Sequence, residues 1–171
     1  MEINLPTGET PFALDRDEGE AVWFAGTLTI IKATGENTQG SFSMVEQLAP
    51  PGFGPPRHVH DEDDEMFYII EGEAEFESGD LHTQAGPGTT VYLPHGTPHA
   101  WRTTEQTRLI QLTFQTGFEQ FFIEMGTPAE RMELPPEPEE PPDVEAIMNR
   151  MSELGEKYGF ELLGPPLGTE E

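Results

Sequence analysis

Residues 52–72 read GFGPPRHVHDEDDEMFYIIEG and hold two histidines and a glutamate in close succession. On a β-strand His58 and His60 point to the same side, because side chains alternate between the two faces of a strand. Glu65 is out of phase with them, so it joins them only if residues 61–64 form a loop before a new strand begins. The acidic run at these positions favours such a loop. The segment therefore predicts two imidazoles that meet at one point, and a carboxylate that the loop can bring to them.

A second segment, residues 88–103, reads GTTVYLPHGTPHAWRT. Residues 94–96 predict a turn, and His99 is expected to open a strand just after it. The chain has no cysteine, so any metal site must use nitrogen and oxygen ligands. His99 would complete a set of three histidines and one carboxylate for a divalent transition metal, with positions left open for water, oxygen or substrate.

These two segments resemble the paired motifs of the cupin family. The first fits G(X)5HXH(X)4E(X)6G and the second fits G(X)5PXG(X)2H, with the fixed positions at Gly52, His58, His60, Glu65 and Gly72, then Gly88, Pro94, Gly96 and His99. Thr103 stands where the family usually has an asparagine that is not a metal ligand. The resemblance implies an all-β fold, a single double-stranded β-helix or jelly-roll-like barrel. The metal would lie in its lumen on His58, His60, Glu65 and His99.

Within the cupins, the chain resembles bacterial monocupins of the quercetin 2,3-dioxygenase-like type. The resemblance implies an oxygenase that binds one divalent metal (Fe, Mn, Co, Ni, Cu or Zn) and acts on a flavonol or enediol-type small molecule. Glu65 is then expected to loosen from the metal and act as catalytic general base on a substrate hydroxyl. The alternative is a non-oxidative metal-binding cupin: an isomerase, a lyase or a small-molecule binding module.

Three apolar residues are candidates for the substrate pocket because of their strand parity. Phe67 and Ile69 share the side of Glu65, and Trp101 shares the side of His99, so all three are expected to face the lumen. The alternative is that they are ordinary core residues. In a barrel this small the two readings overlap, because core side chains also form the pocket wall.

Other polar side chains near the motifs have plainer interpretations. Glu62, Asp63 and Asp64 compete with Glu65 for the carboxylate role, but they indicate a solvated acidic loop. His82 follows a turn and is expected to be exposed. His95 is expected beside the metal, which leaves open a role toward the metal or the substrate.

Glycine and proline divide the chain into short segments, as is typical of an all-β domain. Strands are expected over Trp23–Ile31, Gly40–Leu48, Arg57–His60, Glu65–Ile70, Ala74–Glu77, Thr89–Leu93, His99–Thr103, Arg108–Thr113 and Phe118–Ile123. We expect one domain, with an N-terminal β extension of the barrel (1–50), a cupin core with both motifs (51–125), and a Pro/Glu linker followed by a C-terminal helix (126–171). Asp143 should cap that helix, and the apolar positions from Val144 to Tyr158 should dock on the barrel or on a partner.

The chain is strongly acidic: 33 Asp and Glu against 8 Lys and Arg give a net charge of -25 and a pI near 4.2. Such a surface repels phosphate backbones, so nucleic-acid binding is not expected. The apolar runs are too short to span a membrane, and the N-terminus lacks a signal-peptide pattern, so a cytoplasmic location is expected. The acidity suits either a protein adapted to concentrated salt or an ordinary acidic protein. The β extension and the apolar helix face predict a homodimer formed through sheet extension.

Overall fold

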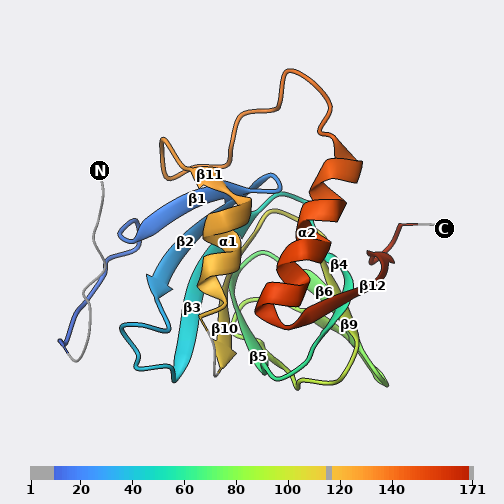
Figure 1. Ribbon diagram of the computed structural model, residues 1–171, viewed down its shortest axis with the longest axis horizontal. Coiled ribbons are helices and arrows are strands. Elements are labelled where there is room, and N and C mark those ends of the chain that lie inside the picture. Colours follow the sequence, from blue (N-terminus) through green and yellow to red (C-terminus); the bar gives the residue numbers. More distant parts are fainter. Residues whose placement is uncertain (1–9, 115–116, 170–171) are drawn as a thin grey trace.

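Two antiparallel sheets form the body of the computed structural model, which describes residues 10–114 and 117–169 (Figure 1). The first sheet has the order β11-β1-β2-β3-β10-β5-β8 and the second has the order β12-β4-β9-β6-β7. The strands are β1 (Glu20–Phe24), β2 (Thr27–Ala33), β3 (Phe42–Ala49), β4 (Pro56–His60), β5 (Glu65–Glu71), β6 (Ala74–Ser78), β7 (Leu81–Ala85), β8 (Thr90–Leu93), β9 (His99–Thr103), β10 (Thr107–Phe114), β11 (Thr127–Pro128) and β12 (Phe160–Pro166). This arrangement is a jelly-roll type fold, and the predicted all-β class is confirmed.

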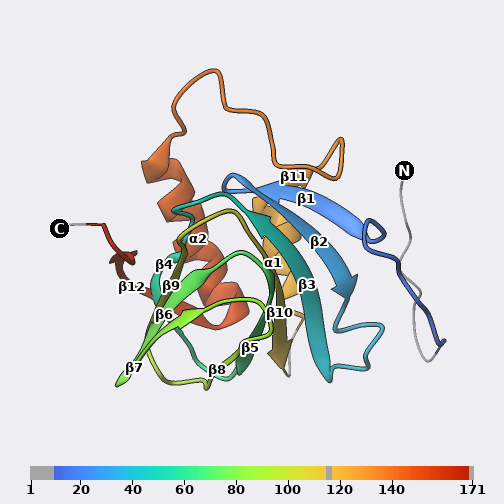
Figure 2. The same cartoon turned by 180° about the vertical axis from the view of Figure 1, so that it is seen from behind.

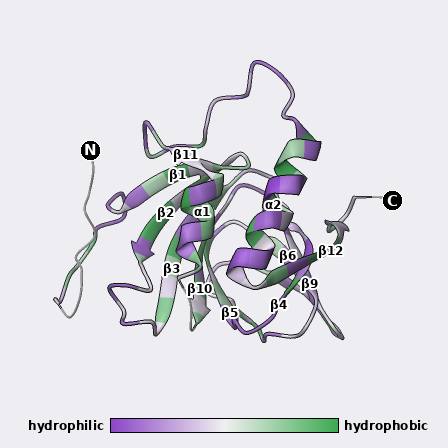
Figure 3. Cartoon of the chain, viewed as in Figure 1, coloured by the Kyte–Doolittle hydropathy of each residue, from purple (hydrophilic) through white to green (hydrophobic). Residues whose placement is uncertain are grey.

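Two helices, α1 (Glu119–Met125) and α2 (Val144–Tyr158), lie on one side of the sheets, and Figure 2 shows them behind the strands. Hydrophilic and hydrophobic residues alternate along α2 (Figure 3). As predicted, the Asp143 side chain caps α2 by accepting a hydrogen bond from the Ala146 backbone at 3.0 Å. The apolar face docks only in part, because Met151 and Leu154 are buried whereas Val144 is 63% exposed. None of the helices in the described ranges is long and apolar enough to cross a membrane.

The core has two clusters. One joins β1, β2 and β3 to α1, α2 and β12, and it consists of Val22, Phe24, Ile31, Val45, Phe118, Phe121, Phe122, Met151, Leu154 and Phe160. The other fills the space between the two sheets and consists of Phe67, Ile69, Ala74, Phe76, Ala85, Val91, Leu93, Trp101 and Leu109. Phe53 packs against both clusters, so the motif segment that begins at Gly52 lies at the junction between them.

Two of the predicted strands are wrong. The expected strand Trp23–Ile31 is a hairpin, because Ala25 and Gly26 both have positive φ angles of 49° and 86°, the backbone pattern of a two-residue turn between strands. The expected strand Phe118–Ile123 is helix α1 instead. Its aromatic residues Phe118, Phe121 and Phe122 have the i, i+3, i+4 spacing that buries one helix face, and a short apolar run does not by itself separate helix from strand.

β7 and β12 were not expected from the sequence. β12 pairs antiparallel with β4, with Phe160 opposite His60 and Leu162 opposite His58. Its prolines are tolerated because β12 lies at the edge of its sheet, where a missing N–H breaks no ladder. The C-terminal segment therefore lies directly against the strand that carries two of the predicted ligands.

Thermal stability is expected to rise when NaCl increases from 0.1 M to 1 M. The net charge of -25 makes the folded chain repel itself, and the Debye length falls from about 10 Å to about 3 Å over this range. The melting temperature followed by circular dichroism tests this, with sucrose of equal osmolality as the control for solute exclusion. A melting temperature that stays flat or falls would contradict the salt-adapted interpretation of the acidic surface.

Candidate metal centre

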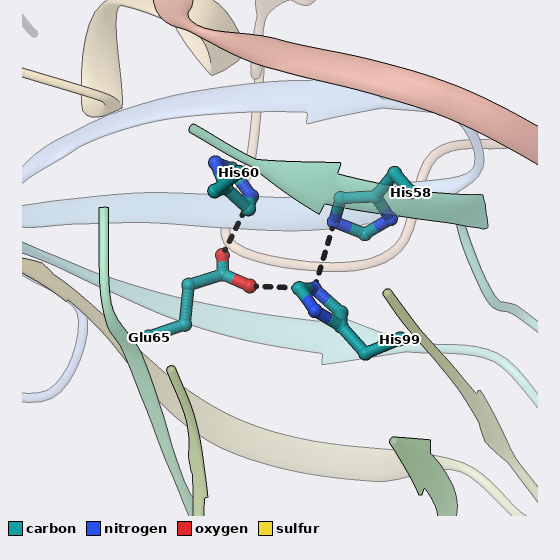
Figure 4. Close-up of side chains that lie close together, drawn as sticks. All are labelled: His58, His60, Glu65 and His99. Carbon is teal, nitrogen blue, oxygen red and sulfur yellow. Dashed lines mark hydrogen bonds and ion pairs between the residues drawn. The ribbon is translucent and has the colours of Figure 1, made fainter. Parts of the chain in front are cut away.

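Four side chains from three strands converge in the interior (Figure 4). His58 and His60 lie on β4, Glu65 is the first residue of β5, and His99 is the first residue of β9. All four are buried, and one ligand atom from each lies within 4.8 Å of the others. The structure therefore brings together the residues that the motif spacing selected, and this group can hold a metal ion.

The distances within the group suit a shared cation. His58 Nε2 lies 3.1 Å from His99 Nε2, and Glu65 Oε2 lies 3.0 Å from the same His99 nitrogen. Glu65 Oε1 lies 3.5 Å from His60 Nε2. Two atoms that each lie about 2.1 Å from one ion are about 3.0 Å apart when the ligands are at right angles.

The tautomers of two histidines are fixed by the backbone. His58 Nδ1 lies 2.8 Å from the Pro56 carbonyl oxygen, and His99 Nδ1 lies 3.1 Å from the Thr97 carbonyl oxygen. A carbonyl only accepts, so each Nδ1 carries a proton and, in the neutral ring, each Nε2 carries a lone pair. Two lone pairs that face one another at 3.1 Å repel unless a cation lies beside both.

Unpaired polar atoms point to the same conclusion. His60 Nε2 and Glu65 Oε2 are buried and have no hydrogen-bond partner among the described residues. A buried polar atom that lacks a partner is destabilising by roughly 1–3 kcal/mol. The donor set of three imidazoles and one carboxylate, with unpaired atoms turned toward one point, fits a divalent transition metal.

The protonation states also suit metal binding. Burial lowers the pKa of His58 to about 4. Burial alone would raise the pKa of Glu65, but the nearby imidazoles of His60, His99 and His58 lower it to about 2. At neutral pH His58 is therefore neutral and Glu65 is ionised, which are the forms that coordinate metals.

Gln111 on β10 is a site residue that the sequence analysis missed. Its Nε2 donates a hydrogen bond to Glu65 Oε1 at 2.6 Å, and its side chain is buried. Gln111 shares the inward parity of Leu109 and Thr113, so a glutamine among inward positions of a strand was the available signal. The contact orients the carboxylate and leaves Oε2 directed at the histidines.

Gln111→Leu is expected to lower metal affinity by a factor of about 10 to 100, because outer partners that orient ligands typically contribute this much. Competition with a chromogenic chelator measures the affinity. The matched control is Gln84→Leu, a glutamine exposed on β7. Equal affinities for Gln111→Leu and the wild type would show that the hydrogen bond does not orient Glu65.

A cavity of about 50 Å³ adjoins the group and is lined by two of its four members, His58 and Glu65. Its polar lining residues are Gln47, His58, Glu65 and Gln111, and the rest of the lining is apolar and mostly aromatic: Phe24, Phe53, Pro55, Pro56, Trp101, Phe118, Phe121, Phe122, Met151, Phe160 and Leu162. Trp101 is thus among the lining residues, and its role toward a substrate stays a prediction. Phe67 and Ile69 lie behind it in the core cluster between the sheets, outside the lining, and their role as pocket residues stays a prediction.

Comparison with known proteins gives the family. The model of the cupin domain matches residues 44–113, which hold all four converging residues. The chain belongs to the cupin superfamily. Curated cupin relatives include quercetin 2,3-dioxygenase of Bacillus subtilis, which is 31% identical over 136 residues, 79% of this chain and 40% of that protein.

A second relative is dimethylsulfoniopropionate lyase DddQ of Ruegeria pomeroyi, 41% identical over 78 residues, which are 45% of this chain and 38% of that protein. The chain thus spans about two fifths of the length of both curated relatives. Among solved structures, an RmlC-like cupin from Shewanella frigidimarina matches with a TM-score of 0.54 and 15% identity, covering 67% of this chain and 99% of that one. This likeness shows the fold.

The cupin motif departs from the family at Thr103 without disturbing β9. The buried Thr103 hydroxyl donates to the Pro50 carbonyl oxygen at 2.6 Å and accepts from the Phe53 backbone N–H at 3.0 Å. These bonds tie the end of β9 to the loop that places Phe53 at the cavity, 5.5 Å from the Trp101 ring. Threonine therefore fixes the loop geometry at this cupin position.

The acidic loop of the cupin motif is only partly solvated, which corrects the expectation. Glu62 is exposed, but Asp63 is buried. Asp64 accepts hydrogen bonds from the Tyr92 hydroxyl at 2.8 Å and from the His95 backbone at 2.9 Å. The loop is thus tied to β8 and the turn after it, which holds Glu65 at the start of β5.

The two remaining histidines lie outside the cupin cavity. The His82 side chain is 69% exposed, as predicted. The His95 side chain is 53% exposed, and its Nδ1 lies 2.7 Å from Asp64 Oδ1. His95 is not among the lining residues, and a role toward the metal or substrate stays a prediction.

Proposed function

We propose that this chain is a metal-dependent cupin oxygenase that acts on a flavonol or enediol-type small molecule. The observation that carries the proposal is one ionised, buried carboxylate, Glu65, that reaches an aromatic-lined cavity beside three histidines. The similarity to a quercetin 2,3-dioxygenase supports the same class of reaction.

His58, His60, Glu65 and His99 would hold the metal. Iron, manganese, cobalt, nickel, copper and zinc all accept three imidazoles and one carboxylate, so availability decides which is bound. When bound, the metal supplies a Lewis-acidic centre with open positions and, for a redox-active ion, access to dioxygen.

The protein's own groups bind and deprotonate the substrate. The rings of Phe53, Trp101 and Phe160 line the cavity and favour a planar molecule, and the wall has to move outward from its volume of about 50 Å³ to admit a flavonol. Glu65 Oε2 has no hydrogen-bond partner in the described parts of the chain and accepts the proton of the substrate hydroxyl. Gln111 holds Oε1 through its hydrogen bond, which keeps the carboxylate oriented during the transfer.

A non-oxidative reaction is the second candidate, favoured by one observation. The cavity of about 50 Å³ is smaller than the roughly 300–1,000 Å³ of pockets that enclose drug-sized ligands. A small substrate would fit with less movement of the wall, and one of the curated relatives is a lyase. Among the lining residues of this cavity Glu65 is ionised and His58 is neutral at pH 7, so any such reaction would rely on the same carboxylate.

Oxygen uptake separates the two candidates. The protein loaded with Fe, Mn, Co or Ni should consume dioxygen in proportion to an added flavonol, measured with an oxygen electrode, and metal removal should stop the uptake. No uptake with any flavonol or enediol tested would exclude the oxygenase. Conversion of substrate under anaerobic conditions would then support a lyase or isomerase.

We also propose that the protein is a homodimer. β11 already pairs with β1 opposite Val22 and Trp23, which leaves less of that edge free for sheet extension. The outward face of β3, β10 and β5 carries half-buried apolar side chains on either side of the buried Glu46–Arg108 ion pair: Met44, Leu48, Met66, Ile110 and Leu112. An apolar row on a sheet face suits contact with a second copy.

Light scattering at micromolar concentration is expected to give twice the 19.0 kDa mass of the chain. Ile110→Lys places a charge in the centre of the apolar row and should shift the mass toward the monomer. A wild-type mass of one chain would contradict the dimer.

A further inference from the structure

Gln47 on β3 is a buried amide whose acceptor is unused. The side chain is 1% exposed and lines the cavity, and its Oε1 has no hydrogen-bond partner within the described structure. Leaving a buried acceptor unpaired destabilises a fold, so such a group is retained where a ligand completes it.

The neighbours of Gln47 do not complete it. Its cross-strand partners are Thr29 on β2 and Leu109 on β10. The Thr29 hydroxyl lies 3.3 Å from the Thr27 hydroxyl, and Leu109 is apolar. Neither cross-strand neighbour therefore supplies a donor to Gln47 Oε1.

Gln47 also belongs to the one polar wall of the cavity. Gln47 and Gln111 share the inward face of the adjacent strands β3 and β10. The hydrogen bond from Gln111 to Glu65 connects this face to the candidate metal centre. The α1, α2 and β12 residues that face this wall are aromatic or aliphatic. A planar molecule in the cavity would thus meet apolar surfaces around it and amides along one edge.

We infer that Gln47 is a specificity-determining residue that binds a hydroxyl group of the substrate away from the reacting enol. Oε1 needs a donor, and an amide oxygen carries no formal charge to balance a buried ammonium group, so a neutral hydroxyl matches better. The inference rests on the proposed function and narrows it to substrates that carry a second hydroxyl on the ring remote from the enol.

Gln47→Leu tests this with two flavonols that are identical except for one hydroxyl on the remote ring. The wild type should prefer the hydroxylated flavonol by about tenfold or more in kcat/KM, because its analogue leaves the amide unpaired. In Gln47→Leu the ratio should fall toward one, with unchanged metal content. Gln84→Leu is the control and should keep the wild-type ratio. An unchanged ratio in Gln47→Leu overturns the inference.

Anaerobic binding separates this inference from the proposed function. Quenching of tryptophan fluorescence reports the affinity of the same two flavonols without turnover. If neither is oxidised but the tenfold preference in binding is present and is lost in Gln47→Leu, the oxygenase proposal fails and the role of Gln47 stands. If both are oxidised with equal preference in wild type and variant, the oxygenase stands and the inference fails. If neither flavonol binds, both are overturned.

Stability gives a third readout. The melting temperature of Gln47→Leu should equal or exceed that of the wild type, because replacing an unpaired amide by a side chain of similar size removes a desolvated group. A fall of several degrees would show that Gln47 has a structural hydrogen bond, which would overturn the assignment.

Discussion

His60→Ala is expected to abolish stoichiometric metal binding. The His60 side chain is 1% exposed, and its Nε2 is one of the unpaired atoms directed at the other three residues. Alanine removes this ligand, and the remaining two histidines and the carboxylate would have to hold the metal with one more open position. Metal content after dialysis should fall from about one ion per chain to near zero.

Elemental analysis measures the metal content, and circular dichroism confirms that the variant is folded. His60→Gln keeps more of the side-chain volume beside Phe118, whose ring centroid lies 5.0 Å from that of His60. His60→Gln therefore provides a second test of the ligand if His60→Ala does not fold. His82→Ala, at the exposed histidine, is the matched control and should keep its metal. Full metal content in both His60 variants would show that the four residues are not the metal site.

Glu65→Gln is expected to retain much of the metal and to lose turnover by a factor of about 10² or more, the usual contribution of a general base. The three histidines still supply their nitrogens, and the new amide oxygen can still accept the hydrogen bond from Gln111. What the amide cannot do is take a proton from the substrate hydroxyl. The effect should therefore fall on kcat with little change in metal content.

Glu62→Gln is the isosteric control, because Glu62 is an exposed carboxylate three residues away. Oxygen uptake and elemental analysis on the same samples distinguish the roles of Glu65. Parallel loss of metal and activity would mean that Glu65 is a structural ligand only. Unchanged turnover would remove Glu65 from the catalytic machinery.

The sequence predicts the converging residues well because their geometry is local. His58 and His60 share a face by strand alternation, and the short loop returns Glu65 to the same point. A single strand pairing, β4 with β9, brings His99 to the group, because it places His99 directly opposite His58. Spacing within two short segments therefore carries most of the information about the four residues.

The cavity wall is less predictable because it depends on distant pairings. Gln47 and Gln111 lie just outside the two motifs and Phe160 lies far beyond them, and all three reach the cavity only through strand registers that are fixed when the sheets assemble. Helix α1 was mistaken for a strand for a related reason. Its phenylalanines suit either structure in isolation, and packing against β1 and β12 selects the helix.

The pairing of β12 with β4 links the end of the described chain to the metal centre. His58 and His60 lie opposite Leu162 and Phe160, so one ladder of hydrogen bonds holds both the ligand-bearing strand and the C-terminal strand. If metal binds only to the ordered β4, mass action makes its binding energy oppose the undocking of β12 as well. Occupancy of the site and protection of the tail from proteases would then rise and fall together, although no residue of β12 is a ligand.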